Sequence, residues 1–138
     1  IVNNNMSVLL RAINLSNCVM LQFQPDGIRP HIRINGAWNW WEHREVNLTF
    51  GTPLSLDRWY KCKIACSKDN IGIHLFDEEQ SLFEREWKIP VGAMMFKYGQ
   101  DTTTIQIPFS INLEYGSIGF RNAEQERSLI KDIIVQKI

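Results

Sequence analysis

A row of basic residues on one predicted strand is the part of this sequence best suited to bind a ligand. In the segment 28–34, Arg29, His31 and Arg33 alternate with apolar residues, so they point to one face of a β-strand. Guanidinium and imidazole groups supply many directional hydrogen-bond donors. This row is therefore suited to a polar or anionic ligand.

Aromatic residues directly follow the basic row. Asn35 lies in an Asn-Gly turn that ends the strand, and Trp38 and Trp40 share a face if the next strand is regular. An indole packs against the apolar face of a sugar ring, while planar polar groups bind its hydroxyls or a carboxylate. The predicted carbohydrate-binding residues are Arg29, His31, Arg33, Asn35, Trp38 and Trp40. The alternative is a solvated outer face whose arginines pair with Glu42 or Glu45 across the hairpin.

Paired carboxylates are the residues that glycoside hydrolysis would require. Glu84 and Glu86 would lie on one face of a strand, about 7 Å apart, between the separations typical of retaining and inverting enzymes. We interpret them as part of a charged edge strand and predict no catalytic residue. No Ser-His-Asp or Cys-His pair follows from the spacing.

The sequence predicts no cofactor. The carboxylates of Asp77-Glu78-Glu79 are of the type that calcium prefers, but they lack EF-hand spacing, and we interpret them as a solvated turn. Cys18, Cys62 and Cys66 have no zinc-site spacing, and we predict three small, buried, reduced thiols, which favours a reducing compartment.

Composition excludes several classes of partner. The 138 residues carry 15 Lys and Arg against 15 Asp and Glu, so the net charge is zero. This balance argues against a nucleic-acid binder and against electrostatic adhesion to acidic membranes. No apolar stretch approaches the roughly 20 residues of a membrane span. Because Ile1-Val2-Asn3 is not a natural translation start, we expect a single domain, 1–138, excised from a longer multidomain chain.

The elements that must position these residues are short alternating segments broken by turns, which predict an all-β sandwich or barrel. The predicted strands cover Met6–Ile13, Cys18–Gln24, Ile28–Ile34, a segment opened by Trp38, Glu45–Phe50, Trp59–Cys66, Ile71–Phe76, Glu84–Trp87, Ser117–Arg121 and Leu129–Lys137. We expect Trp59 to open a core strand and a bulge at Lys131-Asp132. Residues 90–110 are the least regular, with a long exposed loop at 98–101.

The order of these segments resembles the concanavalin A-like jelly-roll domains. The later part of the chain carries the match, in Arg58-Trp59-Tyr60-Lys61-Cys62-Lys63-Ile64, Ile71-Gly72-Ile73-His74-Leu75-Phe76-Asp77, Gly116-Ser117-Ile118-Gly119-Phe120-Arg121 and Ile130-Lys131-Asp132-Ile133-Ile134-Val135. The earlier segments Leu10-Arg11-Ala12, Cys18 to Phe23 and Ile28 to Trp38 resemble the "F-R-A … N-Y-Y-M-W-Q-F … L-R-P-H-V-x-x-N-G-x-W" run of accessory domains in bacterial α-L-rhamnosidases. Here Cys18-Val19 stands where aromatic residues are usual.

This resemblance implies a two-sheet antiparallel jelly-roll sandwich. It also implies a non-catalytic accessory or carbohydrate-binding module of a bacterial glycoside hydrolase, located in the cytoplasm, at the cell surface or outside the cell with its parent enzyme. Its partner would be a weakly bound glycan or the parent's catalytic domain. The alternatives are a small jelly-roll glycoside hydrolase that uses Glu84 and Glu86, and a laminin G-like protein-interaction module. The spaced E-x-D-x-E strand of related glucanases is incomplete at Glu84-Arg85-Glu86.

Overall fold

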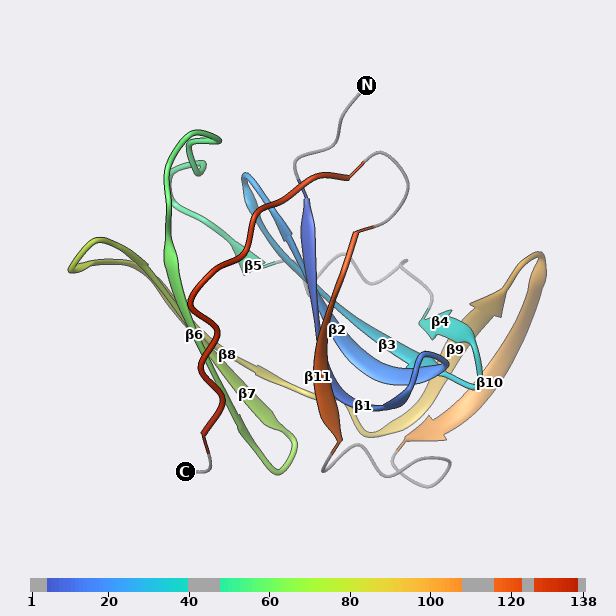
Figure 1. The fold of residues 1–138 in the computed structure, drawn as a ribbon. Helices are drawn as coiled ribbons and strands as arrows, with labels where there is room; N and C mark the ends of the chain where they lie inside the picture. Colours follow the sequence, from blue (N-terminus) through green and yellow to red (C-terminus); the bar gives the residue numbers. More distant parts are fainter. Residues whose placement is uncertain (1–4, 40–47, 108–115, 123–125, 137–138) are drawn as a thin grey trace.

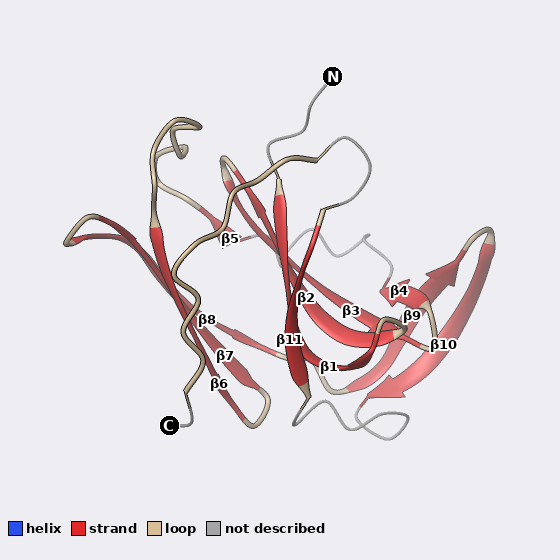
Figure 2. Ribbon diagram, in the orientation of Figure 1, coloured by secondary structure: helices blue, strands red, loops and turns tan. Residues whose placement is uncertain are grey.

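The computed structural model describes residues 5–39, 48–107, 116–122 and 126–136, and in this part of the chain every regular element is a β-strand (Figures 1 and 2). The strands are β1 (Met6–Asn14), β2 (Asn17–Gln24), β3 (Gly27–Ile34), β4 (Ala37–Asn39), β5 (Leu48–Thr49), β6 (Lys61–Ser67), β7 (Asn70–Asp77), β8 (Gln80–Lys88), β9 (Gly92–Tyr98), β10 (Asp101–Ile107) and β11 (Ser117–Arg121).

These strands form two antiparallel sheets that pack as a sandwich. The large sheet has the order β10-β9-β4-β3-β2-β1-β11, with β5 paired to β3, and the small sheet has the order β6-β7-β8. Figure 1 shows the small sheet beside the first strands of the large sheet, and the β9–β10 hairpin at its far end. The predicted all-β, two-sheet antiparallel fold is confirmed, and the arrangement is compatible with a jelly roll.

The hydrophobic core lies between the two sheets. Val19 and Leu21 of β2 and Ile32 of β3 are fully buried there, against Ile71 and Ile73 of β7. Along β3 the inward residues alternate with polar ones, as the sequence pattern predicts, whereas in β2 the residue between Val19 and Leu21 is the buried, apolar Met20. Burying each such side chain stabilises the fold by about 1.5–3 kcal/mol, so the core fixes which face of each strand points inward.

The other face of the large sheet therefore carries the basic row. In the pairing of β2 with β3, Cys18 lies opposite Arg33 and Met20 lies opposite His31. Since Ile32 and Ile34 point into the core, the residues that alternate with them along β3 point away from the small sheet. The register of two central strands thus places Arg29, His31 and Arg33 on the surface that faces away from the small sheet.

A bulge in β1 and a glycine position the last strand beside it. The registers of β1 with both neighbours shift after Leu9 and Leu10, and Arg11 has a φ of 51°. A Cβ atom on Gly116, whose φ is 147°, would lie 2.4 Å from the carbonyl carbon of Arg11. Only glycine fits this approach, which brings the start of β11 against the bulge.

The segment expected to be irregular forms a regular hairpin. Strands β9 and β10 pair in continuous register from Asp101 opposite Tyr98 to Ile107 opposite Gly92. The predicted long loop at 98–101 is therefore wrong, because Gly99 and Gln100 make a tight turn. Much of this hairpin is exposed on both faces, so it lacks the apolar alternation that marks a half-buried strand.

The predicted strand Leu129–Lys137 is wrong for its described part, 129–136. This segment has no strand pairing, and Ile134 and Val135 are 81% and 68% exposed. Its alternation has the period of a strand, but a strand also needs a neighbour to satisfy its backbone hydrogen bonds. Asp132 has a φ of 53°, which breaks the extended course of the segment at the predicted bulge position.

Three expectations for the small sheet are also corrected. Trp59 precedes β6 rather than opening it, and it is 52% exposed, with the Lys131 ammonium 4.4 Å from its ring centroid. All three cysteines are free, but Cys62 and Cys66 are exposed and only Cys18 is buried. The exposed cysteines and Trp59 lie on or just before β6, which is an edge strand of the small sheet and is exposed at every position except Ile64.

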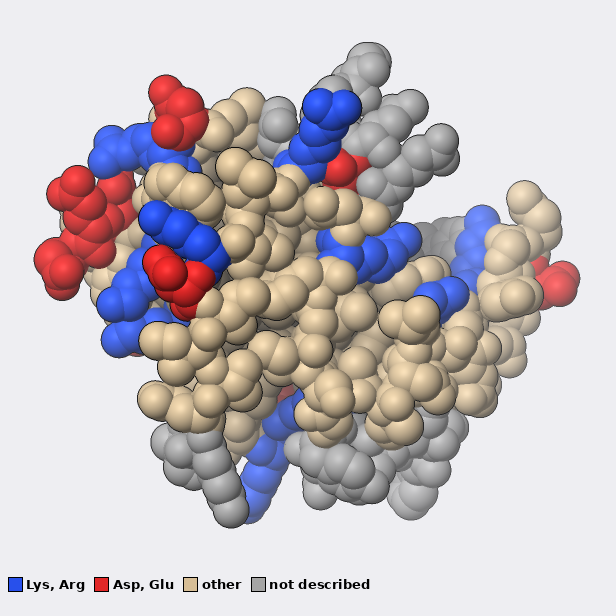
Figure 3. Space-filling view, in the orientation of Figure 1, with Lys and Arg blue, Asp and Glu red and all other residues tan. Residues whose placement is uncertain are grey.

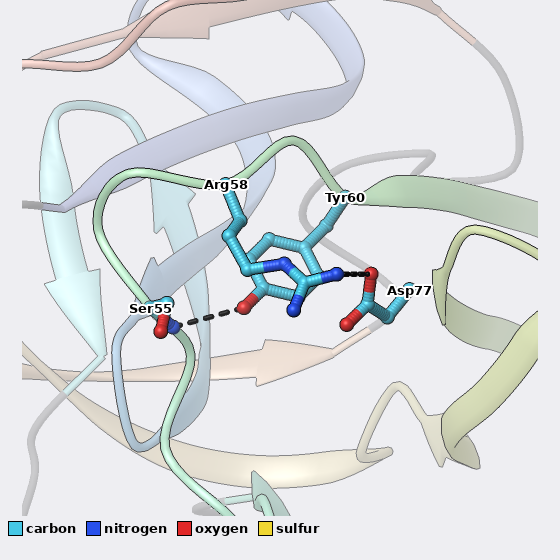
Figure 4. Close-up of polar contacts among 4 residues, drawn as sticks. All are labelled: Ser55, Arg58, Tyr60 and Asp77. Atoms are coloured by element: carbon cyan, nitrogen blue, oxygen red, sulfur yellow. Dashed lines mark hydrogen bonds and ion pairs between the residues drawn. The ribbon is translucent and has the colours of Figure 1, made fainter.

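Two polar contacts fix the segment that leads into β6 (Figure 4). The hydroxyl oxygen of Tyr60 accepts a hydrogen bond of 2.9 Å from the backbone N–H of Ser55, and Arg58 forms a 2.7 Å ion pair with Asp77. The ion pair joins this segment to the end of β7. It also means that the Asp77 carboxylate, which we considered as a calcium ligand, already has a cationic partner.

Candidate functional site

A groove on the outer face of the large sheet is the candidate functional site. Its volume is about 530 Å³, within the usual range for small-molecule sites. Its described lining residues come from β2, β3, β4, β9, the turn after β9, and β11. They are Met20, Gln22, His31, Trp38, Asn39, Lys97, Gly99 and Arg121.

The groove exists because the large sheet is curved. Lys97 of β9 and Arg121 of β11 line the same hollow, although β9 and β11 are five strand steps apart. In a flat sheet that separation would be about 24 Å, at about 4.8 Å per step. Curling of the β9–β10 hairpin, visible in Figure 1, brings the two ends of the sheet to one concave surface.

Trp38 lies at the centre of this surface, between two guanidinium groups and an imidazole. The guanidinium carbons of Arg33 and Arg121 lie 5.0 and 5.8 Å from its ring centroid, within range of cation–π attraction. The ring of His31 meets it edge-on, with centroids 5.7 Å apart. Trp38 also packs on the buried Cys18 and Met20. The tryptophan thereby orients both arginines over the floor of the groove.

Three polar residues form a chain at one side of the groove. The amide Nε2 of Gln22 donates to Glu126 at 3.0 Å, and His31 Nε2 lies 3.3 Å from Gln22 Oε1. Because a carboxylate only accepts, the amide nitrogen of Gln22 must face Glu126 and its oxygen must face His31. His31 Nε2 is therefore the protonated nitrogen of a neutral ring.

Burial keeps that imidazole neutral. The pKa of His31 is lowered to about 3, mainly because burial penalises the charged ring, and the nearby charges of Arg29 and Arg121 act in the same direction. The positive charge of the site therefore resides on arginine and lysine side chains, not on His31. None of the eight described lining residues is acidic.

Figure 3 shows Lys and Arg side chains, in blue, at the surface between β11 and the β9–β10 hairpin, where the groove lies. A buried thiol also lies within the field of these cations. Burial raises the pKa of the Cys18 thiol, while Arg33 and Arg121 oppose that rise. The arrangement can bind an anion or a polar ring, with hydrogen-bond donors around an apolar floor.

The predicted binding residues divide into three groups. His31 and Trp38 line the groove, and Arg33 reaches it through its contact with Trp38. Arg29 is exposed on the same strand, and Asn35 lies in the β3–β4 turn, where its N–H donates to Asn17 Oδ1 at 2.8 Å. Trp40 lies outside the described residues, as do Glu42 and Glu45, which we considered as partners for the arginines.

Sequence reasoning missed six of the described lining residues: Met20, Gln22, Asn39, Lys97, Gly99 and Arg121. Met20 and Gln22 could have been found, because they share a face with Cys18 and their strand precedes the basic row. Lys97 and Arg121 carry no local signal. They reach the site only through the strand order and the curvature of the sheet.

A Ser-His-Glu cluster lies on the small sheet, and spacing had not revealed it. His74 Nε2 is 2.8 Å from Ser81 Oγ, and its Nδ1 is 3.7 Å from Glu84 Oε1. The side chain of Glu84 is 73% exposed, and Glu86 is exposed as well. A triad carboxylate acts from a buried position that fixes the imidazole, so this exposed cluster lacks a feature that nucleophilic catalysis needs.

The described residues contain no group of three or more His, Cys, Asp and Glu side chains placed to hold a metal ion. In the same part of the chain, no helix is long and apolar enough to cross a membrane. Comparisons with protein-family models, with curated proteins and with solved structures find no match for this chain.

Proposed function

We propose that this chain is a non-catalytic carbohydrate-binding β-sandwich module of a larger glycoside hydrolase of the α-L-rhamnosidase type. The observation that supports it most is the groove around Trp38, where an aromatic residue, two amides and cationic donors converge on one concave surface. The rhamnosidase assignment depends on the resemblance of the segments from Leu10 to Trp38 to accessory domains of those enzymes.

The composition of the groove favours binding over bond cleavage. Glycoside hydrolysis usually requires two carboxyl groups on either side of the scissile bond. Glu126, an acidic residue that contacts the lining through Gln22, is 9% exposed, and its Oε1 accepts hydrogen bonds from Gln22 and Asn5. A carboxylate held in this way serves to position Gln22 and not to attack a sugar.

The amide and imidazole groups give the groove a fixed pattern of donors and acceptors. Gln22 is held by Glu126, and Asn39 Oδ1 accepts a 2.9 Å hydrogen bond from the N–H of Ile32. Such pre-oriented groups bind hydroxyls without losing much side-chain freedom. Because the groove is open along one side of a sheet, we propose weak binding that keeps the parent enzyme on its polysaccharide, or that braces its catalytic domain.

Glycan binding is tested with wild type and two tryptophan variants. The protein is screened on an array of plant and bacterial polysaccharides, and each hit is titrated calorimetrically. We expect Trp38→Leu to weaken binding at least about tenfold, because it removes the floor and releases both arginines. Trp59→Leu, which removes an exposed indole from the other side of the molecule, should leave affinity unchanged.

Two outcomes would overturn the proposal. One is a wild-type protein that binds no glycan, or binds equally well without Trp38. The other is hydrolysis of aryl rhamnosides or glucans by wild type that Glu84→Gln abolishes, which would replace the binding module by a small glycoside hydrolase. The reading frame of the parent tests the accessory role, since a helical-barrel hydrolase domain in the same frame is expected.

A further inference from the structure

We infer that the groove selects an acidic sugar, a glycan whose carboxylate is bound by the guanidinium groups of Arg33 and Arg121. This inference rests on the proposed function and adds the substrate class. Three observations carry it: the charges around the groove, the unused donors of the two arginines, and the way in which Trp38 is covered.

The first observation is the imbalance of charge. Lys97 and Arg121 line the groove, Arg33 lies over Trp38, and none of the described lining residues is acidic. The chain as a whole has no net charge, so the described part of the lining is richer in cations than the composition alone would give. Glu126 offsets part of this excess from behind Gln22. A ligand with a carboxylate would be attracted to the open side of the groove.

The second observation is the number of donors that the arginines retain. Arg33 donates from Nε to the Gly36 carbonyl at 3.3 Å and from Nη1 to the Leu15 carbonyl at 2.9 Å. A guanidinium has five N–H donors, so about three remain. Among the described residues, the one hydrogen bond of Arg121 runs from Nη1 to the sulfur of Met20, at 3.9 Å. Neither arginine forms an ion pair with a described residue.

The third observation concerns the face of Trp38. A neutral sugar would stack on the indole, but both guanidinium groups already lie over that ring. A guanidinium held over an aromatic ring can still direct its N–H edge toward a ligand, and this edge matches the two oxygens of a carboxylate. Trp38 is therefore a positioning residue for the arginines, and the ligand meets guanidinium edges before it meets the ring.

The remaining lining favours a sugar acid over a phosphate polymer. Gln22 and Asn39 offer amide groups for hydroxyls, and Met20 and Trp38 offer apolar surface. A polyphosphate chain would instead need a continuous basic track, and the electroneutral chain argues against one. A sugar sulfate is also an anion that arginine could bind. We favour a carboxylate, because the planar guanidinium group fits its two oxygens with two parallel hydrogen bonds, and the experiment compares both kinds of ligand.

The test uses pairs of ligands that differ only in charge. Oligomers of galacturonate, of mannuronate and guluronate, and of hyaluronan are titrated beside the same oligomers with each carboxyl reduced to an alcohol, and dextran sulfate is a separate arm. We expect at least one acidic oligomer to bind about tenfold or more tightly than its reduced form. Arg121→Gln should remove most of that difference, because it takes away one of the two guanidinium groups that would bind the carboxylate.

Control variants separate charge from fold. Arg85→Gln removes an exposed arginine from the small sheet and should preserve the acidic preference. Arg121→Lys keeps the positive charge but lacks the planar pair of N–H donors, so it should retain part of the preference for the acidic oligomer. Thermal unfolding of each variant verifies that it is folded. If Arg121→Gln does not fold, Arg33→Gln replaces it in the same titrations.

Each result decides the inference. Equal binding of acidic and reduced oligomers, both dependent on Trp38, would overturn the acidic preference and leave glycan binding intact. Binding of dextran sulfate alone would overturn the carboxylate assignment. If no acidic or neutral glycan binds at all, the inference and the proposed function both fail.

Discussion

Arg33 and Trp38 lie directly opposite each other on β3 and β4, with the guanidinium carbon 5.0 Å from the ring centroid. The hairpin that joins them is short, because the Asn35-Gly36 turn accepts positive φ angles of 50° and 83°. A local turn thus produces a pair that the large sheet then presents in its groove. The same arginine also holds two carbonyl groups from neighbouring turns.

The first prediction concerns the contribution of Arg33 to the stability of the fold. Arg33→Met keeps an unbranched chain against Trp38 but leaves the carbonyls of Leu15 and Gly36 without their side-chain donors. We expect the free energy of unfolding to fall by about 1–2 kcal/mol in urea denaturation. Arg29→Met, on the same face of the same strand but exposed, should change it by less than about 0.5 kcal/mol. Equal effects of the two substitutions would contradict the assigned contacts.

The second prediction concerns pH and His31. Its folded pKa of about 3 lies below the ordinary value of 6.5, so between these values the unfolded chain binds more protons than the folded one. Stability is therefore complete above pH 6.5 and falls as pH decreases toward 3, by at most about 1.4 kcal/mol per pH unit. Around the ring, Arg29 and Arg121 oppose protonation, and Glu126 lies beyond Gln22.

Urea denaturation at pH 7, 6, 5 and 4 measures this dependence, with His31→Gln as the variant. We expect the variant to lose stability less steeply with falling pH than wild type. His74→Gln removes an imidazole from the small sheet and serves as the control. A wild-type slope unchanged in His31→Gln would show that other groups cause the loss of stability.

The third prediction concerns a buried hydrogen bond at the end of β4. The side-chain oxygen of Asn39, 7% exposed, accepts the N–H of Ile32 at 2.9 Å. Asn39→Leu leaves this buried donor unsatisfied, so we expect a loss of about 1–3 kcal/mol in the free energy of unfolding. Asn39→Asp keeps a side-chain oxygen in the position that accepts the N–H of Ile32, so it tests whether this acceptor alone maintains the stability. Faster exchange of the Ile32 amide in Asn39→Leu is the specific readout, and unchanged exchange would refute it.

The fourth prediction is a stabilising substitution. Ser7 is fully buried on β1, and its hydroxyl has no hydrogen-bond partner among the described residues. Ser7→Ala removes an unsatisfied polar group at nearly constant volume. We expect stability to rise by up to about 1 kcal/mol, measured by chemical denaturation. A loss larger than about 1 kcal/mol would mean that the hydroxyl is hydrogen-bonded in solution.

The parts of the fold set by local alternation could be predicted from the sequence. Strands β1 to β3 and β6 to β7 follow the expected segments closely, and the inward direction of Ile32 and Ile34 follows from period-two patterning. The β9–β10 hairpin could not be predicted in this way, because most of its residues are exposed or half-buried and do not alternate clearly between apolar and polar types. The segment 129–136 shows the converse error, since it alternates without a partner strand.

The candidate site follows the same division. Arg33, His31 and Trp38 belong to one hairpin, so their spacing alone places them together. Lys97 and Arg121 join them through five strand pairings and a curved sheet, and neither property is encoded near those residues. Exposure of Cys62 and Cys66 likewise depends on the strand order, which leaves β6 at the edge of the small sheet.

The most direct test of the central claim is an NMR titration of the ¹⁵N-labelled chain with an acidic oligosaccharide from the binding screen, following the indole and guanidinium N–H signals. The account predicts that the signals of Trp38, Arg33 and Arg121 shift together with one saturation curve, while those of Trp59 and Trp87 stay in place. Shifts confined to Trp59, or no shift of Trp38 and Arg121 at saturating ligand, would contradict it.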